Sequence, residues 1–192
     1  SSSYIFEVSP TGYLLHLYYG AYVPDTDLDY LRMRLGNASF SANVIAPEEH
    51  GLSLDTAAVE YPVNGTGDFR VSALSIRGEN GNSATDIRYK SHRIYVTLIY
   101  TAFAKLDAIT RSVRVKNTSE KKFRLDRIHS ACVDFTGMDF EMLHLQGRWA
   151  KERTLVKRHL EFGLQGIHSK RGSSSHNNNP FVALARDGYT EE

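Results

Sequence analysis

The sequence predicts an all-β fold, an antiparallel sandwich of short strands. Three observations support this prediction: short runs rich in β-branched and aromatic residues, polar turns between these runs, and very little helical periodicity. A chain of 192 residues is long enough to bury a hydrophobic core within one domain. We therefore predict a single domain over residues 1–192 with little helix.

The first predicted strand covers residues 13–19, which are rich in aromatic and leucine side chains. Gly20 follows directly and is expected to end the strand. Residues 69–77 and 84–93 flank a turn that contains an Asn-Gly dipeptide. This dipeptide favours a tight turn, so the two runs are predicted to pair as a hairpin.

One segment between these strands carries a helical signal. Thr26 is a candidate N-cap residue with Asp29 at the capping-box position, and Leu28, Leu31 and Leu35 share one face. The same pattern also suits a loop, so both interpretations remain open.

The next two strands differ in pattern. Residues 96–103 are continuously apolar, which predicts a strand buried on both faces. Residues 109–116 alternate instead, and a polar turn leads from them to a second hairpin partner at residues 123–126. The alternation is expected to place one set of side chains on each face: Ile109, Val113 and Val115 on one, and Thr110, Ser112, Arg114 and Lys116 on the other.

Composition excludes several classes of function. Lys and Arg total 23 against 22 Asp and Glu, so no strong charge attracts nucleic acid or an anionic membrane. No apolar run is long enough to span a bilayer, and the first residues do not resemble a signal peptide. The single cysteine, Cys132, lies in an apolar run and is expected to be a buried, inert thiol. One cysteine favours a reducing compartment, and we expect a cytoplasmic protein.

No catalytic or metal-binding motif stands out. The acidic clusters at residues 25–29 and 48–49 lie in predicted turns, where carboxylates cap backbone donors or face water. The eight histidines show no zinc-binding spacing, and His92 and His176 are expected to be hydrogen-bonding residues. There is no nucleophile elbow, phosphate-binding loop or dinucleotide fingerprint, so no metal and no cofactor are predicted.

Trp149 is the most informative single side chain. A lone tryptophan can be a core residue, but charged side chains flank this one and make complete burial costly. A partly exposed loop is the favoured interpretation, and an exposed aromatic face suits the C–H side of a pyranose ring. The flanking charged residues are Arg148, Lys151, Glu152 and Arg153.

Three sequence blocks in this order resemble the amino-terminal domain of glycoside hydrolase family 36, the α-galactosidases. They are residues 53–70, the motif Gly147-Arg-Trp-Ala-Lys-Glu-Arg153, and the Ser/Asn-rich residues 169–181; residues 12–20, 85–95 and 100–114 extend the match. The resemblance implies a β-supersandwich of the galactose-mutarotase-like type. It also implies a catalytic (β/α)₈ barrel and a carboxy-terminal β domain that are not in this chain.

The reaction implied by the resemblance is hydrolysis of terminal α-1,6-linked galactose from melibiose, raffinose and related α-galactosides, with retention and without metal. Retaining glycosidases use two carboxyl groups roughly 5–5.5 Å apart. In the family these belong to Asp residues of the barrel, so no catalytic residue is expected in this chain. The implied partners are the protein's own barrel and further copies in a homo-oligomer, which is expected to be a tetramer.

The resemblance also assigns two candidate substrate-binding residues. Loops of this domain reach an active site in tetrameric relatives, and the family's tryptophan matches Trp149. A second contact, an Asp in the family, corresponds to Asn37. Asparagine keeps an acceptor oxygen but loses the negative charge.

One departure from the family concerns chain length. Tyr95 runs directly into Val96 in this sequence, whereas relatives insert a few dozen residues there. Losing a piece of that size would expose unpaired strand edges. We therefore predict a missing segment between residues 95 and 96.

Two other functions compete with an α-galactosidase domain. One is a stand-alone, noncatalytic carbohydrate-binding or oligomerisation module, for which Trp149 would be the sugar contact. The other is a sugar epimerase, which needs an acid and a base facing one groove, typically His with Glu. Sequence spacing identifies no such pair.

Overall fold

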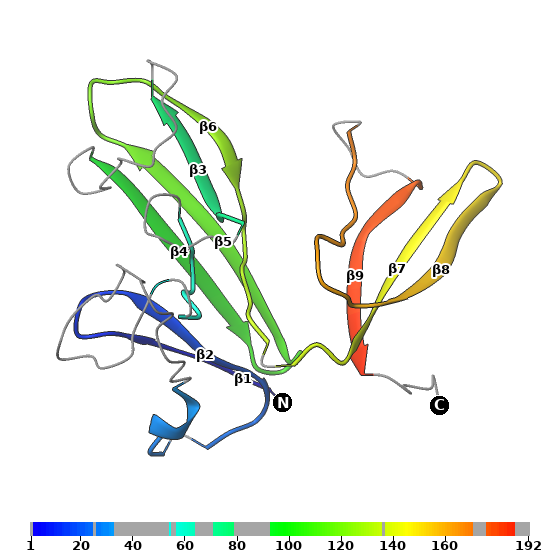
Figure 1. Ribbon diagram of the computed structural model, residues 1–192, viewed down its shortest axis with the longest axis horizontal. Helices are drawn as coiled ribbons and strands as arrows, with labels where there is room; N and C mark the ends of the chain where they lie inside the picture. The colour runs from blue at the N-terminus through cyan, green and yellow to red at the C-terminus, as the bar shows by residue number, and fades with distance from the viewer. Residues whose placement is uncertain are drawn as a thin grey trace. The chain divides into compact units, whose positions relative to one another are not determined.

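The computed structural model describes residues 2–24, 26–32, 54, 57–63, 71–78, 93–135, 137–170 and 176–186. Its elements, in chain order, are β1 (Ser2–Val8), β2 (Leu14–Ala21), the 3₁₀ helix η1 (Asp29–Leu31), β3 (Leu74–Gly78), β4 (Ile94–Phe103), β5 (Ala108–Asn117), β6 (Phe123–Ile128), β7 (Phe140–Arg148), β8 (Lys151–His159) and β9 (Asn178–Arg186). Figure 1 shows these elements. The strand pairings are antiparallel, which confirms the predicted all-β class.

The chain forms two compact units, residues 1–134 and 135–192. The first holds three strand pairs, β1–β2, β3–β6 and β4–β5, and the second is a three-stranded sheet of order β8–β7–β9. The single domain expected over 1–192 stays a prediction. No helix of the described segments is long and apolar enough to cross a membrane.

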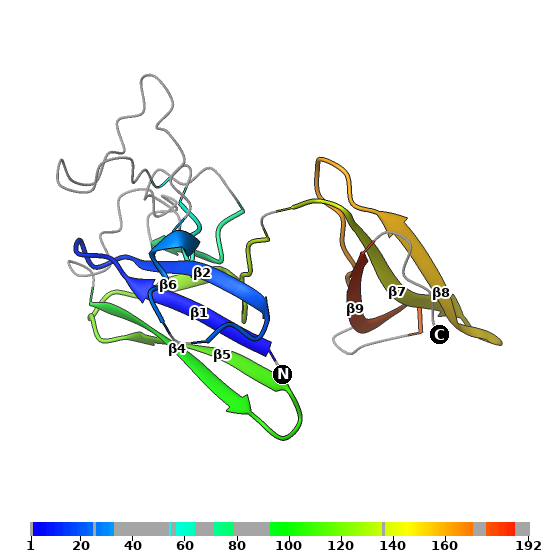
Figure 2. The ribbon, with the colours of Figure 1, turned by 90° about the horizontal axis from the view of Figure 1, so that it is seen from below.

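In the first unit, the β1–β2 pair lies face to face with the β4–β5 pair (Figure 2). Phe6 of β1 stacks on Tyr100 of β4 with ring centroids 5.2 Å apart, and Tyr4 lies 5.8 Å from the same ring. At the start of β1, the Ser2 backbone N–H donates to Oδ1 of Asp107, in the β4–β5 turn, at 2.8 Å. The β1–β2 hairpin therefore covers the inner face of β4 and β5 with aromatic side chains.

The core of this unit forms where β3 and β4 meet residues 57–63. Its buried residues are Tyr61, Ala73, Leu74, Ile76 and Ile94. Apolar side chains of β4, β5 and β6 pack around them. Burial of such side chains supplies the main driving force for folding.

The structure corrects the prediction for residues 96–103. In β4, side chains alternate between partly buried and exposed, and Tyr95 is 59% exposed. The strand is therefore covered on one face: Val96, Leu98 and Tyr100 are partly buried, whereas the alternate residues Thr97, Ile99 and Thr101 are exposed. The prediction for residues 109–116 is confirmed, since β5 alternates in the expected phase.

The second predicted hairpin is wrong. β5 pairs with β4 along its length, and β6 pairs with β3. After β5 the Thr118 N–H donates to the carbonyl of Arg93 at 2.9 Å, which ties the chain to the start of β4 and lets β6 leave for another strand. β3 thus has β6 as its partner in the described part, while residues 84–92, its predicted partner, lie outside the described residues.

Two smaller predictions also change. β2 continues through Gly20 to Ala21, so glycine does not end the strand. The helical segment is a single 3₁₀ turn whose N-cap position is Leu28, without a side-chain cap from Thr26. Leu35 lies outside the described residues.

Candidate functional site: a buried polar cluster and an exposed tryptophan hairpin

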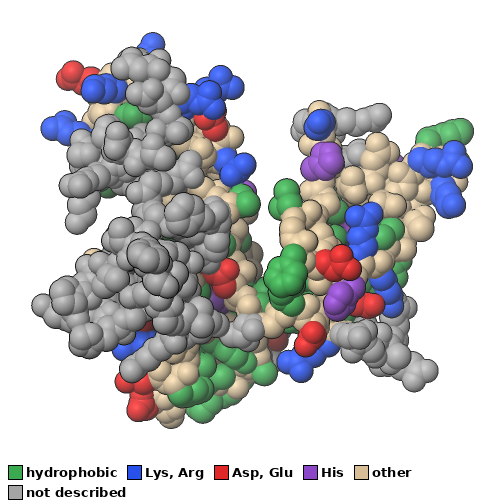
Figure 3. All heavy atoms as spheres, in the orientation of Figure 1, with side chains coloured by type: hydrophobic (Ala, Val, Ile, Leu, Met, Phe, Trp, Pro, Cys, Tyr) green, Lys and Arg blue, Asp and Glu red, His purple; other side chains and the backbone are tan. Residues whose placement is uncertain are grey.

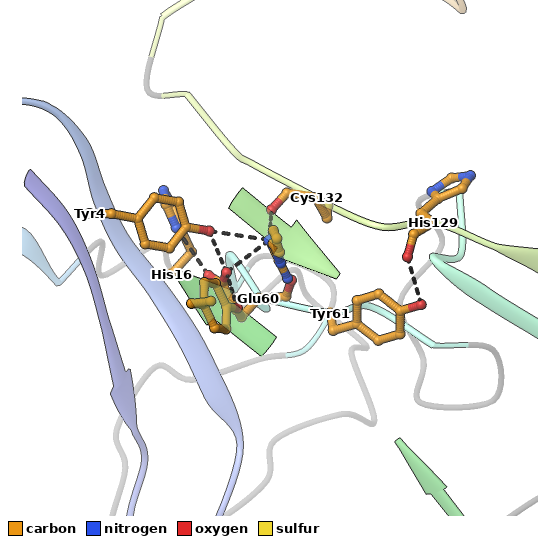
Figure 4. A network of polar contacts seen from close by, with 8 residues as sticks. Tyr4, His16, Glu60, Tyr61, His129 and Cys132 are labelled. Atoms are coloured by element: carbon orange, nitrogen blue, oxygen red, sulfur yellow. Dashed lines mark hydrogen bonds and ion pairs between the residues drawn. The ribbon is translucent and has the colours of Figure 1, made fainter. Parts of the chain in front are cut away.

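The first candidate site is a polar cluster around Glu60 in the first unit (Figure 4). The Glu60 side chain is fully buried, at 0% exposure. The hydroxyls of Tyr4 and Tyr100 both donate to its Oε1, the latter at 2.7 Å. His16 Nδ1 lies 3.1 Å from Oε2. An ionised carboxylate accepts here, which assigns the imidazole proton to Nδ1.

Arg111 supplies the opposite charge. Its Nη1 lies 2.9 Å from Glu60 Oε1 and donates to the Cys132 carbonyl at 2.7 Å. Its Nη2 donates to the Glu60 carbonyl at 2.7 Å, and the guanidinium lies 5.0 Å from the Tyr100 ring centroid. The Arg111 side chain is only 6% exposed, so this is a buried ion pair. Such pairs are tolerated where each charge is also hydrogen-bonded, as both are here.

Strands distant in the sequence build this cluster. β1, β2, β4 and β5 each contribute one partner, and residues 57–63 bring Glu60 between them. The Glu60 N–H donates to the carbonyl of Leu14 at 2.9 Å, and Val59 bridges Leu15 in β2. The cluster therefore joins the two hairpins and the intervening segment.

The surroundings shift the acidities of these groups. Burial raises the pKa of Glu60, but hydrogen bonds from His16, Tyr4 and Tyr100 and the charge of Arg111 together hold this pKa below its ordinary value of 4.5. Burial, the hydrogen bond to Glu60 and its negative charge raise the pKa of Tyr4 and Tyr100 above the ordinary value of 10.0. Glu60 thus remains an anion and the tyrosines remain neutral donors.

We expect the stability of the chain to depend on pH at both extremes. The contribution of Glu60 is present above its ordinary pKa of 4.5 and is lost as pH falls below it, because the folded form has the lower pKa. The contribution of the tyrosines is complete below pH 10.0 and is lost as pH rises further, because their folded pKa is higher. The urea concentration at the midpoint of unfolding, measured across this pH range, tests both expected losses of stability.

The alkaline loss should be smaller in Tyr4→Phe, which removes one of the two shifted hydroxyls. A midpoint at about pH 11 equal to that at about pH 8 would contradict this account of the cluster.

The cluster also bears on the epimerase hypothesis. The structure brings together the His–Glu pair that spacing did not reveal, His16 and Glu60. Their side chains are 4% and 0% exposed, and they bond each other instead of facing a groove. An epimerase needs its acid and base to reach a substrate. The buried His16–Glu60 pair therefore stabilises the fold and does not face a substrate.

The second candidate site is the end of the β7–β8 hairpin. Trp149 and Ala150 form a two-residue loop between the paired residues Arg148 and Lys151. Trp149 is 89% exposed, in agreement with the expected exposed loop. Figure 3 shows hydrophobic side chains next to Lys and Arg side chains at this end of the hairpin. An exposed tryptophan beside polar donors can bind a sugar by stacking and hydrogen bonding.

The backbone at this hairpin end is unusual. A Cβ on Gly147 would lie 2.1 Å from the Lys151 carbonyl oxygen, so only glycine fits there. The pairing register shifts between Gln146 and Arg148, which marks a β-bulge. Ala150 and Arg153 have φ angles of 61° and 57°, conformations that non-glycine residues seldom adopt. Strained backbone of this kind tends to gather at functional sites.

The other predicted site residues fall in different places. Asn37, Glu48, Glu49 and His92 lie outside the described residues, and His176 is exposed in a turn. In the first acidic cluster Asp29 Oδ1 lies 3.7 Å from Arg32 Nη1, and the Asp29 backbone N–H donates to Asp27 Oδ1 at 3.2 Å, as expected for a turn.

Two further findings concern cysteine and metal. Cys132 is partly exposed, not buried, and lies after the end of β6. Within the described ranges, no three His, Cys, Asp or Glu side chains gather in a way that could hold a metal ion.

The comparison with protein families gives one match. The sequence model described as the glycosyl hydrolase family 36 N-terminal domain matches residues 12–97 and 93–192. Among curated proteins, α-galactosidase AgaA of Geobacillus stearothermophilus is 38% identical over 225 aligned positions, covering 99% of this chain and 31% of the relative. The bifunctional α-galactosidase/sucrose kinase AgaSK of Mediterraneibacter gnavus is 35% identical, covering 99% and 24%.

Solved structures agree in fold. A crystal structure of an AgaA variant from Geobacillus stearothermophilus in complex with raffinose matches with a TM-score of 0.83 at 37% identity, covering 97% of this chain and 31% of that one. The galactosidase domain of AgaSK matches with a TM-score of 0.85 at 32% identity, covering 99% and 31%. These neighbours confirm the predicted sandwich fold. The chain spans about a third of the length of these solved relatives.

Proposed function

Because the chain belongs to the glycosyl hydrolase family 36 N-terminal domain family, we propose that it is the amino-terminal part of an α-galactosidase. The enzyme hydrolyses terminal α-D-galactosyl residues of melibiose, raffinose and related sugars with retention. The observation that carries this proposal is 38% identity to an α-galactosidase over 99% of the chain. The complexes of AgaA variants with raffinose and stachyose support the substrate class.

In this proposal the catalytic carboxyl pair lies on a barrel outside the chain. The domain supports that barrel and the oligomer, a tetramer, and lends Trp149 and Asn37 to the sugar pocket. The 89% exposure of Trp149 at a hairpin end supports its part. The single cysteine of the chain supports a cytoplasmic location.

We also propose that the native protein carries a further segment between Tyr95 and Val96. The two matches to the family model meet at residues 93–97, and the alignment with AgaA needs 225 positions for a chain of 192 residues.

The full-length protein tests the proposed reaction. Its denatured mass is expected to be several-fold above 21.6 kDa, and it is expected to release galactose from raffinose and stachyose. Retention predicts that α-galactose appears first in the proton NMR spectrum, before mutarotation mixes the anomers. A purified full-length protein of about threefold larger mass without this activity would contradict the proposal, as would release of β-galactose first.

The exposed Trp149 also favours a second candidate, a noncatalytic carbohydrate-binding module. If the protein is such a module, the polypeptide has a mass near 21.6 kDa, binds galactosides weakly and releases no galactose. The Trp149→Ala variant then loses this binding.

A further inference from the structure

The loop that presents Trp149 has a conformation that its own residues do not favour. Ala150, the second loop residue, has a φ of 61°, where glycine or asparagine is usual. The loop has only two residues, so a change in the backbone of Ala150 would also move its neighbour Trp149. Some other contact is needed to hold this conformation against its alternatives.

Glu152 makes that contact. Its Oε1 accepts a hydrogen bond from the backbone N–H of Ala150 at 2.8 Å. Among the hydrogen bonds found in the described part of the chain, this is the one that joins a side chain to the loop. The bulge opposite Gly147 places Glu152 here: two residues of β8, Glu152 and Arg153, face the one glycine, and the close approach of Gly147 to Lys151 brings the strands together.

Three basic residues surround Glu152 in the sequence, Arg148, Lys151 and Arg153. The carboxylate nevertheless bonds the backbone of the loop. An acceptor that carries charge makes the stronger hydrogen bond to a backbone N–H. The Glu152 side chain therefore orders the loop of Trp149 and Ala150.

We propose that Glu152 is a positioning residue that holds the Trp149 loop in the orientation that receives the sugar. The inference rests on the proposed function of Trp149 as a substrate contact. Without the bond from Ala150, the loop would sample other conformations, and sugar binding would have to order it again. Glu152 itself touches no reacting atom, so its loss should affect binding and not the chemical step.

The test is steady-state kinetics of the full-length protein with raffinose. Glu152→Ala is expected to raise KM about fivefold, the effect of losing one hydrogen bond, and to leave kcat within about twofold. Glu152→Gln keeps an acceptor oxygen but loses the charge, so its KM should lie between the wild-type value and that of Glu152→Ala. Glu161→Ala removes the same charge from an exposed position of the same unit and is the matched control.

Measuring Trp149→Ala in parallel separates the inference from the proposed function. If Glu152 acts through the tryptophan, the double variant Trp149→Ala/Glu152→Ala has the KM of Trp149→Ala alone. If Glu152 only stabilised the fold, the double variant would have a higher KM than Trp149→Ala alone. A wild-type KM in Glu152→Ala, with a raised KM in Trp149→Ala, would overturn the inference alone. A wild-type KM in Trp149→Ala would overturn both.

Discussion

Replacing Arg111 by methionine is expected to lower the free energy of unfolding by about 3 to 5 kcal/mol, because it leaves the buried carboxylate of Glu60 without its cation. Methionine fills much of the same volume, so the effect comes from charge and hydrogen bonding and not from a cavity. Four acceptors lose a donor at once: the Glu60 carboxylate, the Glu60 carbonyl, the Cys132 carbonyl and the Tyr4 hydroxyl. Urea unfolding of the chain measures the difference.

A matched control lies on the same strand. Arg114 points to the opposite, exposed face of β5, and Arg114→Met should change stability by less than about 0.5 kcal/mol. Arg111→Lys keeps the charge but loses the two-pronged guanidinium, so we expect an intermediate loss. Equal stabilities of Arg111→Met and Arg114→Met would show that the buried ion pair contributes nothing measurable.

Local patterns predicted the strands better than their partners. The alternation in residues 109–116 describes β5 correctly, because side-chain direction in a strand follows from its period of two. The pairing of β3 with β6 could not be read in the same way, since 44 residues separate the ends of these strands and no local turn links them. Which strands pair with each other depends on how their apolar faces together complete the hydrophobic core.

The Glu60 cluster was missed because its members lie far apart in the chain. One signal was present: Arg111 stands between Ile109 and Val113 on the inward face of an alternating strand. An arginine at an inward position needs a buried anion, and that requirement predicts a partner without naming it. Glu60 could be identified only once the fold placed residues 57–63 against β2 and β5.

The exposed hairpin end was easier to anticipate. Charged neighbours argued against burial of Trp149, and the structure gives it 89% exposure. The strained conformation of Ala150 and the bond from its N–H to Glu152 are not visible in the sequence, because alanine carries no signal for a positive φ.

Trp149→Ala in the full-length protein is expected to raise KM for raffinose about tenfold, equivalent to about 1.4 kcal/mol of binding free energy. Truncating an aromatic anchor at a binding surface commonly costs at least this much. Because the side chain is 89% exposed, its removal leaves no cavity, and stability should change by less than about 0.5 kcal/mol.

The most direct measurement of the central claim compares Trp149→Ala with Phe162→Ala. Phe162 is an aromatic residue of the same unit with 94% exposure, and it lies away from the hairpin end. The account predicts that KM for raffinose rises about tenfold in Trp149→Ala and stays at the wild-type value in Phe162→Ala. Equal KM values in wild type and Trp149→Ala would contradict the claim that this domain lends its tryptophan to the sugar pocket.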